Sequence, residues 1–125
     1  MKILIVDDIK GWRDYHASFV LELYPNANII FAESAREGYD LLLEHNNSPF
    51  DIILTDMQME EDFSPKYAGE WFIEQIKTFK NYVNTKVFII SAAYNIDHIA
   101  NTLSVNYIRK TTARNFPEVY SELKN

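Results

Sequence analysis

The sequence predicts an α/β protein in which a parallel sheet is covered by helices on both faces. Two observations predict this class. Short apolar runs alternate five times with stretches of helical spacing, which is the order of successive βα units. In addition, central runs such as residues 52–54 are continuously apolar instead of alternating, as expected for parallel strands that are buried on both faces.

The predicted strands are short and rich in β-branched residues. They cover residues 3–6, 28–32, 51–55, 86–90 and 106–109. The first of them runs into Asp7 and Asp8, and the third ends on Asp56. Two strand ends that carry three carboxylates are the chemical signal that the rest of the sequence has to explain.

The helices between these strands are predicted from spacing and from their end signals. The first covers residues 9–24 and is stopped by Pro25, which has no backbone N–H to continue it. The second opens at Ser34, a favourable N-cap with Glu37 three residues later.

The later helices are predicted in the same way. After a loop over residues 57–70, the third helix starts near Gly69 and has apolar positions as far as Phe79. A short fourth helix covers about residues 95–103. The last helix carries apolar residues at i, i+3, i+4 and i+7 from Phe116, and Pro117 is acceptable in its first turn.

Length and composition predict one domain over residues 1–125 with a substantial core. The formal net charge of −6 argues against binding to nucleic acids or anionic membranes, which needs clustered basic residues. No apolar stretch is long enough for a membrane span, and the first strand leaves no room for a signal peptide. Without cysteine there is no thiolate site or disulfide, so the expected location is cytoplasmic.

The residues that could carry chemistry all follow predicted strands. Asp7, Asp8, Asp56, Ser91 and Lys110 lie at or just after strand ends, and the carboxyl ends of parallel strands open on one edge of a sheet. Crowded carboxylates repel one another unless a cation neutralises them, and hard oxygen ligands suit Mg²⁺ or Mn²⁺. A carboxylate held in this way is able to attack phosphorus, while a lysine and a serine hydroxyl stabilise the phosphoryl oxygens.

In these motifs the chain resembles the receiver domain of two-component response regulators, including the chemotaxis regulators. The resemblance covers the whole chain and is carried by ILIVDD at residues 3–8, LTDMQM at 54–59, IISA at 89–92 and YIRK at 107–110. It implies a flavodoxin-like (βα)5 fold: three α/β/α layers around a five-stranded parallel sheet with strand order 2-1-3-4-5.

The resemblance also implies roles for individual residues. Asp56 would be the phospho-acceptor, and Mg²⁺ would be held by Asp7, Asp8, Asp56 and the backbone carbonyl of Gln58. Lys110 would pair with the phosphoryl group, Ser91 would be the switch hydroxyl and Tyr107 the switch aromatic. The implied catalytic residues are thus Asp56, Lys110 and Ser91, the implied switch residues are Ser91 and Tyr107, and the implied metal ligands are Asp7, Asp8, Asp56 and Gln58.

The implied partners are a sensor histidine kinase or a histidine phosphotransfer protein, which would donate the phosphoryl group. The signal would pass through the face made by the fourth helix, fifth strand and fifth helix to a downstream protein or a fused output domain, and a homodimer is compatible with this scheme. Such a domain is a regulator, not a metabolic enzyme.

The chain departs from the family pattern at three places. Glu60 replaces the usual proline after the acceptor, and the first glycine, Gly69, comes thirteen residues past Asp56 in place of about eight, which indicates an insertion within residues 60–68. Thr111 replaces the proline that normally follows the lysine. Only 15 residues separate Ser91 from Tyr107, which predicts a short fourth helix.

Simpler interpretations remain open for single residues. The aspartates favour helix caps and turns, Ser91 and Lys110 are ordinary at strand ends, and Tyr107 could simply pack. His16 is more readily explained as a core or boundary histidine than as a phosphorelay group, and Trp12 as a packing residue. The acidic residues 60–62 are expected to be solvated.

Two other functions compete with a phosphorylatable switch. A degenerate receiver would be a constitutive interaction module, which the missing proline, the insertion and Thr111 favour. A haloacid-dehalogenase-like phosphatase also uses a strand-end aspartate and Mg²⁺, but it needs Asp-x-Asp on its first strand, where this chain has the adjacent pair Asp7 and Asp8.

Overall fold

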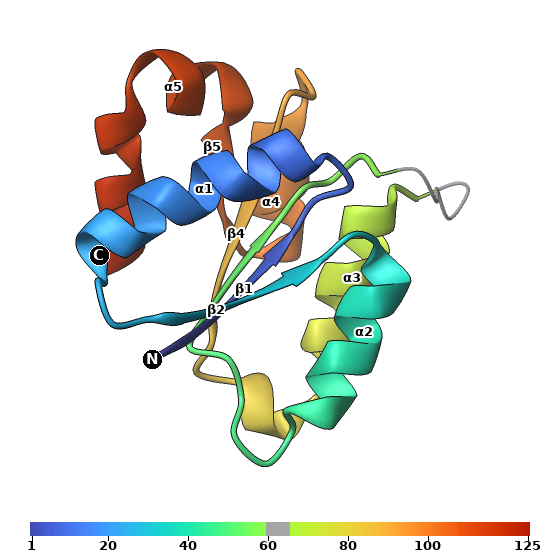
Figure 1. Cartoon of the computed structure of the whole chain (residues 1–125). Helices are drawn as coiled ribbons and strands as arrows, with labels where there is room; N and C mark the ends of the chain where they lie inside the picture. Colours follow the sequence, from blue (N-terminus) through green and yellow to red (C-terminus); the bar gives the residue numbers. More distant parts are fainter. Residues whose placement is uncertain (60–65) are drawn as a thin grey trace.

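A five-stranded parallel sheet forms the centre of the computed structural model, which describes residues 1–59 and 66–125 (Figure 1). Its strands are β1 (Lys2–Val6), β2 (Asn28–Ala32), β3 (Ile52–Thr55), β4 (Lys86–Ser91) and β5 (Asn106–Arg109). They are hydrogen-bonded in the order β2-β1-β3-β4-β5, and every neighbouring pair is parallel. The predicted fold class and strand order are confirmed.

Helices cover both faces of this sheet. They are α1 (Lys10–Leu23), α2 (Ala35–Glu44), α3 (Ala68–Ile76), α4 (Ile96–Leu103), α5 (Lys110–Asn115) and the 3-10 segments η1 (Lys80–Tyr82) and η2 (Pro117–Lys124). One apolar cluster joins the sheet to α1, α5 and η2, and a second joins it to α2, α3 and α4. The molecule therefore has three layers, as Figure 1 shows.

The interior strand β1 divides its side chains between the two clusters. Ile3 and Ile5 belong to the cluster under α1, whereas Leu4 and Val6 belong to the cluster under α2 and α3. All four are buried, so the strand needs apolar residues at every position. This explains the continuous apolar run in the sequence.

The N-terminal helices begin and end close to the predicted positions. α1 covers Lys10–Leu23, just before Pro25, and the backbone N–H of Glu37 donates to the Ser34 hydroxyl at 3.1 Å at the start of α2. α3 ends at Ile76, before Phe79, which instead precedes η1. The predicted short fourth helix is confirmed by α4, which has 8 residues.

The C-terminal region differs from the single final helix that the sequence predicts. α5 already begins at Lys110 and ends at Asn115, and η2 then starts at Pro117. Pro117 has no N–H for the helical hydrogen bond, and a residue before proline avoids the helical region. Phe116 accordingly has φ −137° and ψ 71°, which breaks the helix in two.

Two further expectations concern the acidic loop with its insertion and the absence of a membrane span. The acidic residues 60–62 and most of the predicted insertion lie outside the described residues, which resume at Lys66. In the described parts of the chain, every helix is too short or too polar to cross a membrane.

Candidate functional site

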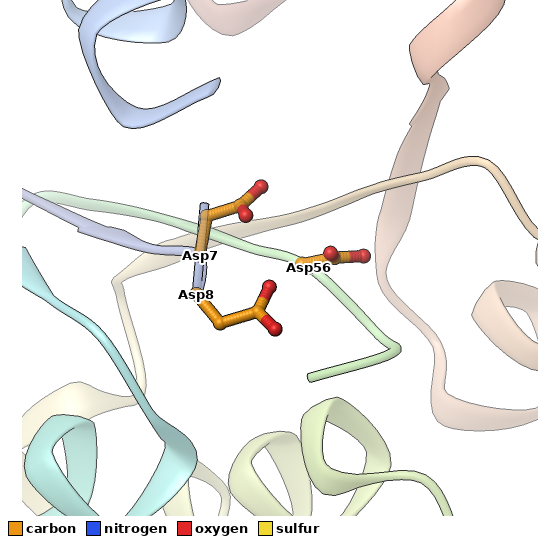
Figure 2. Close-up of side chains that lie close together, drawn as sticks. All are labelled: Asp7, Asp8 and Asp56. Atoms are coloured by element: carbon orange, nitrogen blue, oxygen red, sulfur yellow. The ribbon is translucent and has the colours of Figure 1, made fainter. Parts of the chain in front are cut away.

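Three carboxylates meet at the carboxyl edge of the sheet, from two neighbouring strands. Asp7 and Asp8 follow β1 and Asp56 follows β3, and one oxygen from each lies within 4.8 Å of the others. Figure 2 shows the three side chains gathered on the same side of the two strand ends. The structure therefore brings together the three acidic residues that the sequence analysis singled out.

Strand register explains this meeting. Val6 pairs with Thr55, so the next residues, Asp7 and Asp56, leave adjacent strands at the same level. The Asp56 N–H donates to the Val6 carbonyl at 2.9 Å, and the Asp7 N–H donates to Ala32 on the other side at 3.1 Å. The backbone ladder thus fixes where both carboxylates start.

Asp56 is buried, with 5% of its surface exposed, and its two oxygens have different partners. Oδ1 accepts the backbone N–H of Met57 at 2.7 Å and that of Gln58 at 3.3 Å. Oδ2 accepts a hydrogen bond from Lys110 Nζ at 2.9 Å. Burial raises the pKa of Asp56, the charge of Asp7 raises it further, and Lys110 opposes both without reversing the shift.

Asp7 is fully buried and shares the same lysine. Its Oδ1 accepts the backbone N–H of Ile9 at 2.9 Å, and its Oδ2 lies 3.0 Å from Lys110 Nζ and 3.7 Å from His16 Nε2. Burial raises the pKa of Asp7, but His16, Lys110 and the Ile9 N–H together outweigh burial and lower it. The carboxylate form is therefore favoured at Asp7.

The donor set fits a hard divalent cation. The ligand atoms are carboxylate oxygens, the type that Mg²⁺ and Mn²⁺ prefer. Among the described residues, Asp7 Oδ2 is buried without a partner in hydrogen-bond geometry, although it lies at ion-pair distance from Lys110. A buried carboxylate oxygen left in this way is costly, and a cation beside it would offset that cost.

Lys110 begins α5 and reaches into the acid cluster. Its side chain is buried, and its ammonium lies between Asp7 and Asp56. The same ammonium is 5.0 Å from the centre of the Trp12 ring, within the range of a cation–π interaction. Thr111, which replaces the expected proline, lies in the first turn of α5.

Ser91 and Tyr107 lie on neighbouring strands in contrasting environments. Ser91 is the last residue of β4 and is buried, and its hydroxyl accepts the backbone N–H of Ala93 at 3.2 Å. Tyr107 pairs with Ile89 in the sheet, but 40% of its surface is exposed. Its ring centre is 5.7 Å from the guanidinium carbon of Arg109. In this structure the serine therefore points inward and the tyrosine lies outside.

Gly69 lies directly against the backbone at Asp56, a contact that the sequence analysis did not predict. Its N–H donates to the Met57 carbonyl at 2.9 Å. A Cβ added to Gly69 would lie 2.2 Å from the Asp56 carbonyl oxygen and 2.5 Å from Met57 Cα. The sequence contains a signal, because Gly69 is the first glycine after Asp56, but its position indicated an insertion and the start of a helix and not a contact with the backbone.

Residues of α1 support the site from one side of the sheet. Arg13 donates from its guanidinium to the Asp7 carbonyl at 2.7 Å, a contact that no sequence motif indicated. His16 is a buried core histidine, as predicted. Trp12 packs against the same apolar cluster while its ring contacts Lys110, so packing does not exclude proximity to the site.

Comparison with solved structures gives the same architecture. The chain aligns with the signal receiver domain of a DNA-binding response regulator from Colwellia psychrerythraea 34H at 25% identity and TM-score 0.78, over 99% of this chain and 95% of that one. It aligns with a response regulator receiver domain protein from Clostridium thermocellum at 26% identity and TM-score 0.69, over 97% and 91% of the two chains.

A third match, the chemotaxis response regulator CheY4 of Vibrio cholerae, has 19% identity and TM-score 0.72 over 98% of this chain and 93% of that one, and it supports the fold alone. No protein-family model and no curated protein sequence matches the chain. Fold, strand order and structural neighbours agree with the resemblance seen in the motifs. The architecture of this chain is that of the response regulator receiver domains.

Proposed function

We propose that this domain is a phosphorylation switch that accepts a phosphoryl group on Asp56. The observation that carries the proposal is that the Asp56 carboxylate lies beside both the Lys110 ammonium and the acidic pair that follows β1. A strand-end carboxylate with an ammonium and hard oxygen ligands around it is equipped for phosphoryl transfer.

In the proposed reaction, an Asp56 carboxylate oxygen attacks phosphorus and forms a new P–O bond. The P–N bond to a donor phosphohistidine breaks, and the imidazole leaves with the electron pair and takes up a proton. Two backbone N–H groups hold Asp56 Oδ1, so the carboxylate is oriented before the donor arrives. Burial raises the pKa of Asp56 although Lys110 opposes the shift, so the carboxyl is weakly solvated.

The other residues balance charge on the transferred group. Lys110 would pair with a phosphoryl oxygen, and the Ser91 hydroxyl would donate a hydrogen bond to another. Asp7, Asp8, Asp56 and the carbonyl of Gln58 would hold Mg²⁺, with Mn²⁺ as a substitute. When bound, the cation would neutralise developing negative charge on the phosphoryl group.

The proposed donor is a sensor histidine kinase or a histidine phosphotransfer protein, and the proposed receiver of the signal is a downstream protein or a fused output domain. A surface groove of about 690 Å³ between α4, β5 and η2 supports this face as the output side, and Tyr107 and Arg109 line it. Movement of Ser91 toward the phosphoryl group and of Tyr107 inward would change this groove. We regard the domain as a cytoplasmic regulator and not as a metabolic enzyme.

Mass spectrometry of the intact protein tests the proposal. Incubation with acetyl phosphate and Mg²⁺ is expected to add the mass of one phosphoryl group, and the adduct should disappear in Asp56→Asn and when EDTA replaces Mg²⁺. Asp51→Asn is the matched control. Asp51 immediately precedes the first residue of β3, at the end of the strand away from Asp56, and its carboxylate accepts the Lys2 N–H.

The outcomes separate the competing functions. No adduct from acetyl phosphate, phosphoramidate or a phosphorylated kinase domain would contradict the proposal and favour a constitutive interaction module. An adduct that persists in Asp56→Asn would assign the acceptor to another residue.

A further inference from the structure

A buried polar chain leads from the acid cluster to the C-terminal segment. His16 on α1 lies between Asp7 and Tyr120 of η2, with its Nε2 3.7 Å from Asp7 Oδ2 and its Nδ1 2.5 Å from the Tyr120 hydroxyl oxygen. His16 is 2% exposed and Tyr120 is 1% exposed. Polar groups this deep in an apolar cluster are expensive unless they satisfy one another.

The hydrogen bond to Tyr120 restricts where the imidazole carries its protons. A neutral imidazole has one N–H and one acceptor nitrogen. If the Tyr120 O–H donates to Nδ1, the single hydrogen of the neutral ring is on Nε2 and faces Asp7. A doubly protonated imidazolium also has a hydrogen on Nε2. The remaining arrangement, with the hydrogen on Nδ1 alone, would turn the Nε2 lone pair toward a carboxylate oxygen and is electrostatically unfavourable.

The polar chain formed by Tyr120 and His16 ends at Oδ2 of Asp7, the oxygen that lacks a complete set of partners. Asp7 Oδ1 is fixed by the Ile9 N–H, whereas Oδ2 has no partner in hydrogen-bond geometry among the described residues and faces Lys110 and His16. At 3.7 Å the His16 contact is longer than a hydrogen bond, so it acts through the orientation of the N–H dipole. The Trp12 ring stacks on the imidazole, with the two ring centres 5.4 Å apart, and this contact limits rotation of the imidazole.

We propose that Tyr120 and His16 are positioning residues, which orient the Asp7 carboxylate and thereby set the affinity of the acid cluster for Mg²⁺. Tyr120 fixes the proton position and rotation of His16, and His16 directs its Nε2–H dipole toward Asp7 Oδ2. Partners of metal-ligating groups commonly tune affinity in this way. The inference rests on the proposed function, because it assumes that Asp7 serves a metal site.

Isothermal titration calorimetry of the full chain with MgCl₂ tests the inference. Tyr120→Phe removes only the hydroxyl and retains the ring that stacks on Phe19. Tyr82→Phe is the matched control, because Tyr82 is also buried and also loses one hydrogen bond, to the Leu42 carbonyl, but it lies in the cluster on the other face of the sheet.

We expect Tyr120→Phe to raise the Kd for Mg²⁺ about threefold or more and His16→Leu to raise it about tenfold. The double variant should have the Kd of His16→Leu alone, because Tyr120 acts through His16. His16→Gln, whose amide N–H is able to replace Nε2–H, should recover part of the affinity. Tyr82→Phe should keep the wild-type Kd despite a comparable loss of thermal stability.

The outcomes distinguish this inference from the proposed function. If the wild type binds Mg²⁺ and Tyr120→Phe and His16→Leu bind it equally well, the positioning role is overturned and the proposed function stands. If the wild type does not bind Mg²⁺, both are overturned. Imidazole ¹⁵N NMR gives a readout without metal: protonation at Nε2 supports the inference, and a ring protonated on Nδ1 alone overturns it.

Discussion

Asp56 is a carboxylate in a place that favours its neutral form. Burial raises its pKa above the ordinary value of 3.8, Asp7 adds to this effect, and Lys110 only partly compensates. When the pKa of a carboxyl is higher in the folded than in the unfolded protein, the free energy of unfolding decreases as the pH rises from the unfolded-state pKa to the folded-state pKa. Above the folded-state pKa this cost is fully present, as is common where reactivity is favoured over stability.

Replacing Asp56 with Asn should therefore stabilise the metal-free protein at pH 7, because the neutral amide removes a buried charge and keeps the shape. The midpoint of thermal unfolding in EDTA is expected to rise above that of the wild type, and the difference should shrink as the pH falls below the folded-state pKa. Circular dichroism melts at several pH values check this. A lower midpoint for Asp56→Asn at pH 7 would show that the Lys110 ion pair outweighs the cost of burial.

Asp7 has the opposite pH behaviour, since its pKa is lowered despite burial. It contributes stability above its unfolded pKa and loses that contribution as the pH falls through the folded value. The strand ends alone predict that these two residues lie on the same edge of the sheet, and the resemblance adds that their strands are neighbours. The sequence could not predict their opposite shifts, because those depend on the Lys110 and His16 side chains that reach them from α5 and α1.

At the level of elements, α3 and the end of β3 are in contact through the backbone. The missing side chain of Gly69 is what permits this approach, because a Cβ would overlap the Asp56 carbonyl. Gly69→Ala should destabilise the fold by about 3 kcal/mol or more, because backbone atoms cannot yield as a flexible side chain can. It should also slow the reaction with acetyl phosphate by displacing Asp56.

Gly11→Ala is the matched control for this variant. Gly11 lies in α1 with nothing within 4 Å of an added Cβ, and alanine in a helix is favoured over glycine by about 0.5–1 kcal/mol. Urea denaturation should show opposite changes in the free energy of unfolding for the two substitutions. Equal effects would mean that the contact at Gly69 is relieved by a small movement of α3.

Element boundaries show where local sequence signals were sufficient. Continuous apolar runs predicted β1, β3 and β4 because these interior strands are buried between two helix layers, and Ser34 marked the start of α2. The end of α3 and the division of the last helix were missed. Apolar spacing around Phe116 looked helical, but the constraints imposed by Pro117 decided the backbone there.

At the scale of the whole molecule, the acid cluster joins two strands in the middle of the sheet. A cation bound there would link β1 to β3 in the folded state only, so it should stabilise the fold by mass action. At 100 times the Kd, one bound Mg²⁺ is worth about 2.7 kcal/mol. We expect the thermal midpoint of the wild type to rise with MgCl₂ in differential scanning calorimetry and to return on addition of EDTA.

Asp8→Asn should reduce this Mg²⁺-dependent rise, while Asp51→Asn should leave it unchanged. The same rise in all three proteins would contradict specific binding at the cluster and indicate a general salt effect on a chain with net charge −6.

The prediction of the overall topology rested on two different grounds, one for the fold class and one for the strand order. Alternating strands and helices gave the fold class on physical grounds, because parallel strands need helical crossovers. The strand order came from the resemblance of the motifs around Asp56 and Lys110, since local periodicity does not say which strands are neighbours. Contacts between distant helices, such as that between His16 and Tyr120, have no local signal in the sequence.

Both chain ends lie at the edge of the sheet opposite the acid cluster. The Met1 carbonyl accepts the Asn28 N–H at the start of β2. The side-chain Nζ of Lys86, the first residue of β4, donates to the Leu123 carbonyl at 3.3 Å near the end of η2. A biotin or fluorophore attached at either end would therefore leave Asp56 facing away from the attachment point. Protein immobilised through Asn125 on a biosensor chip should present its reactive edge to a kinase in solution.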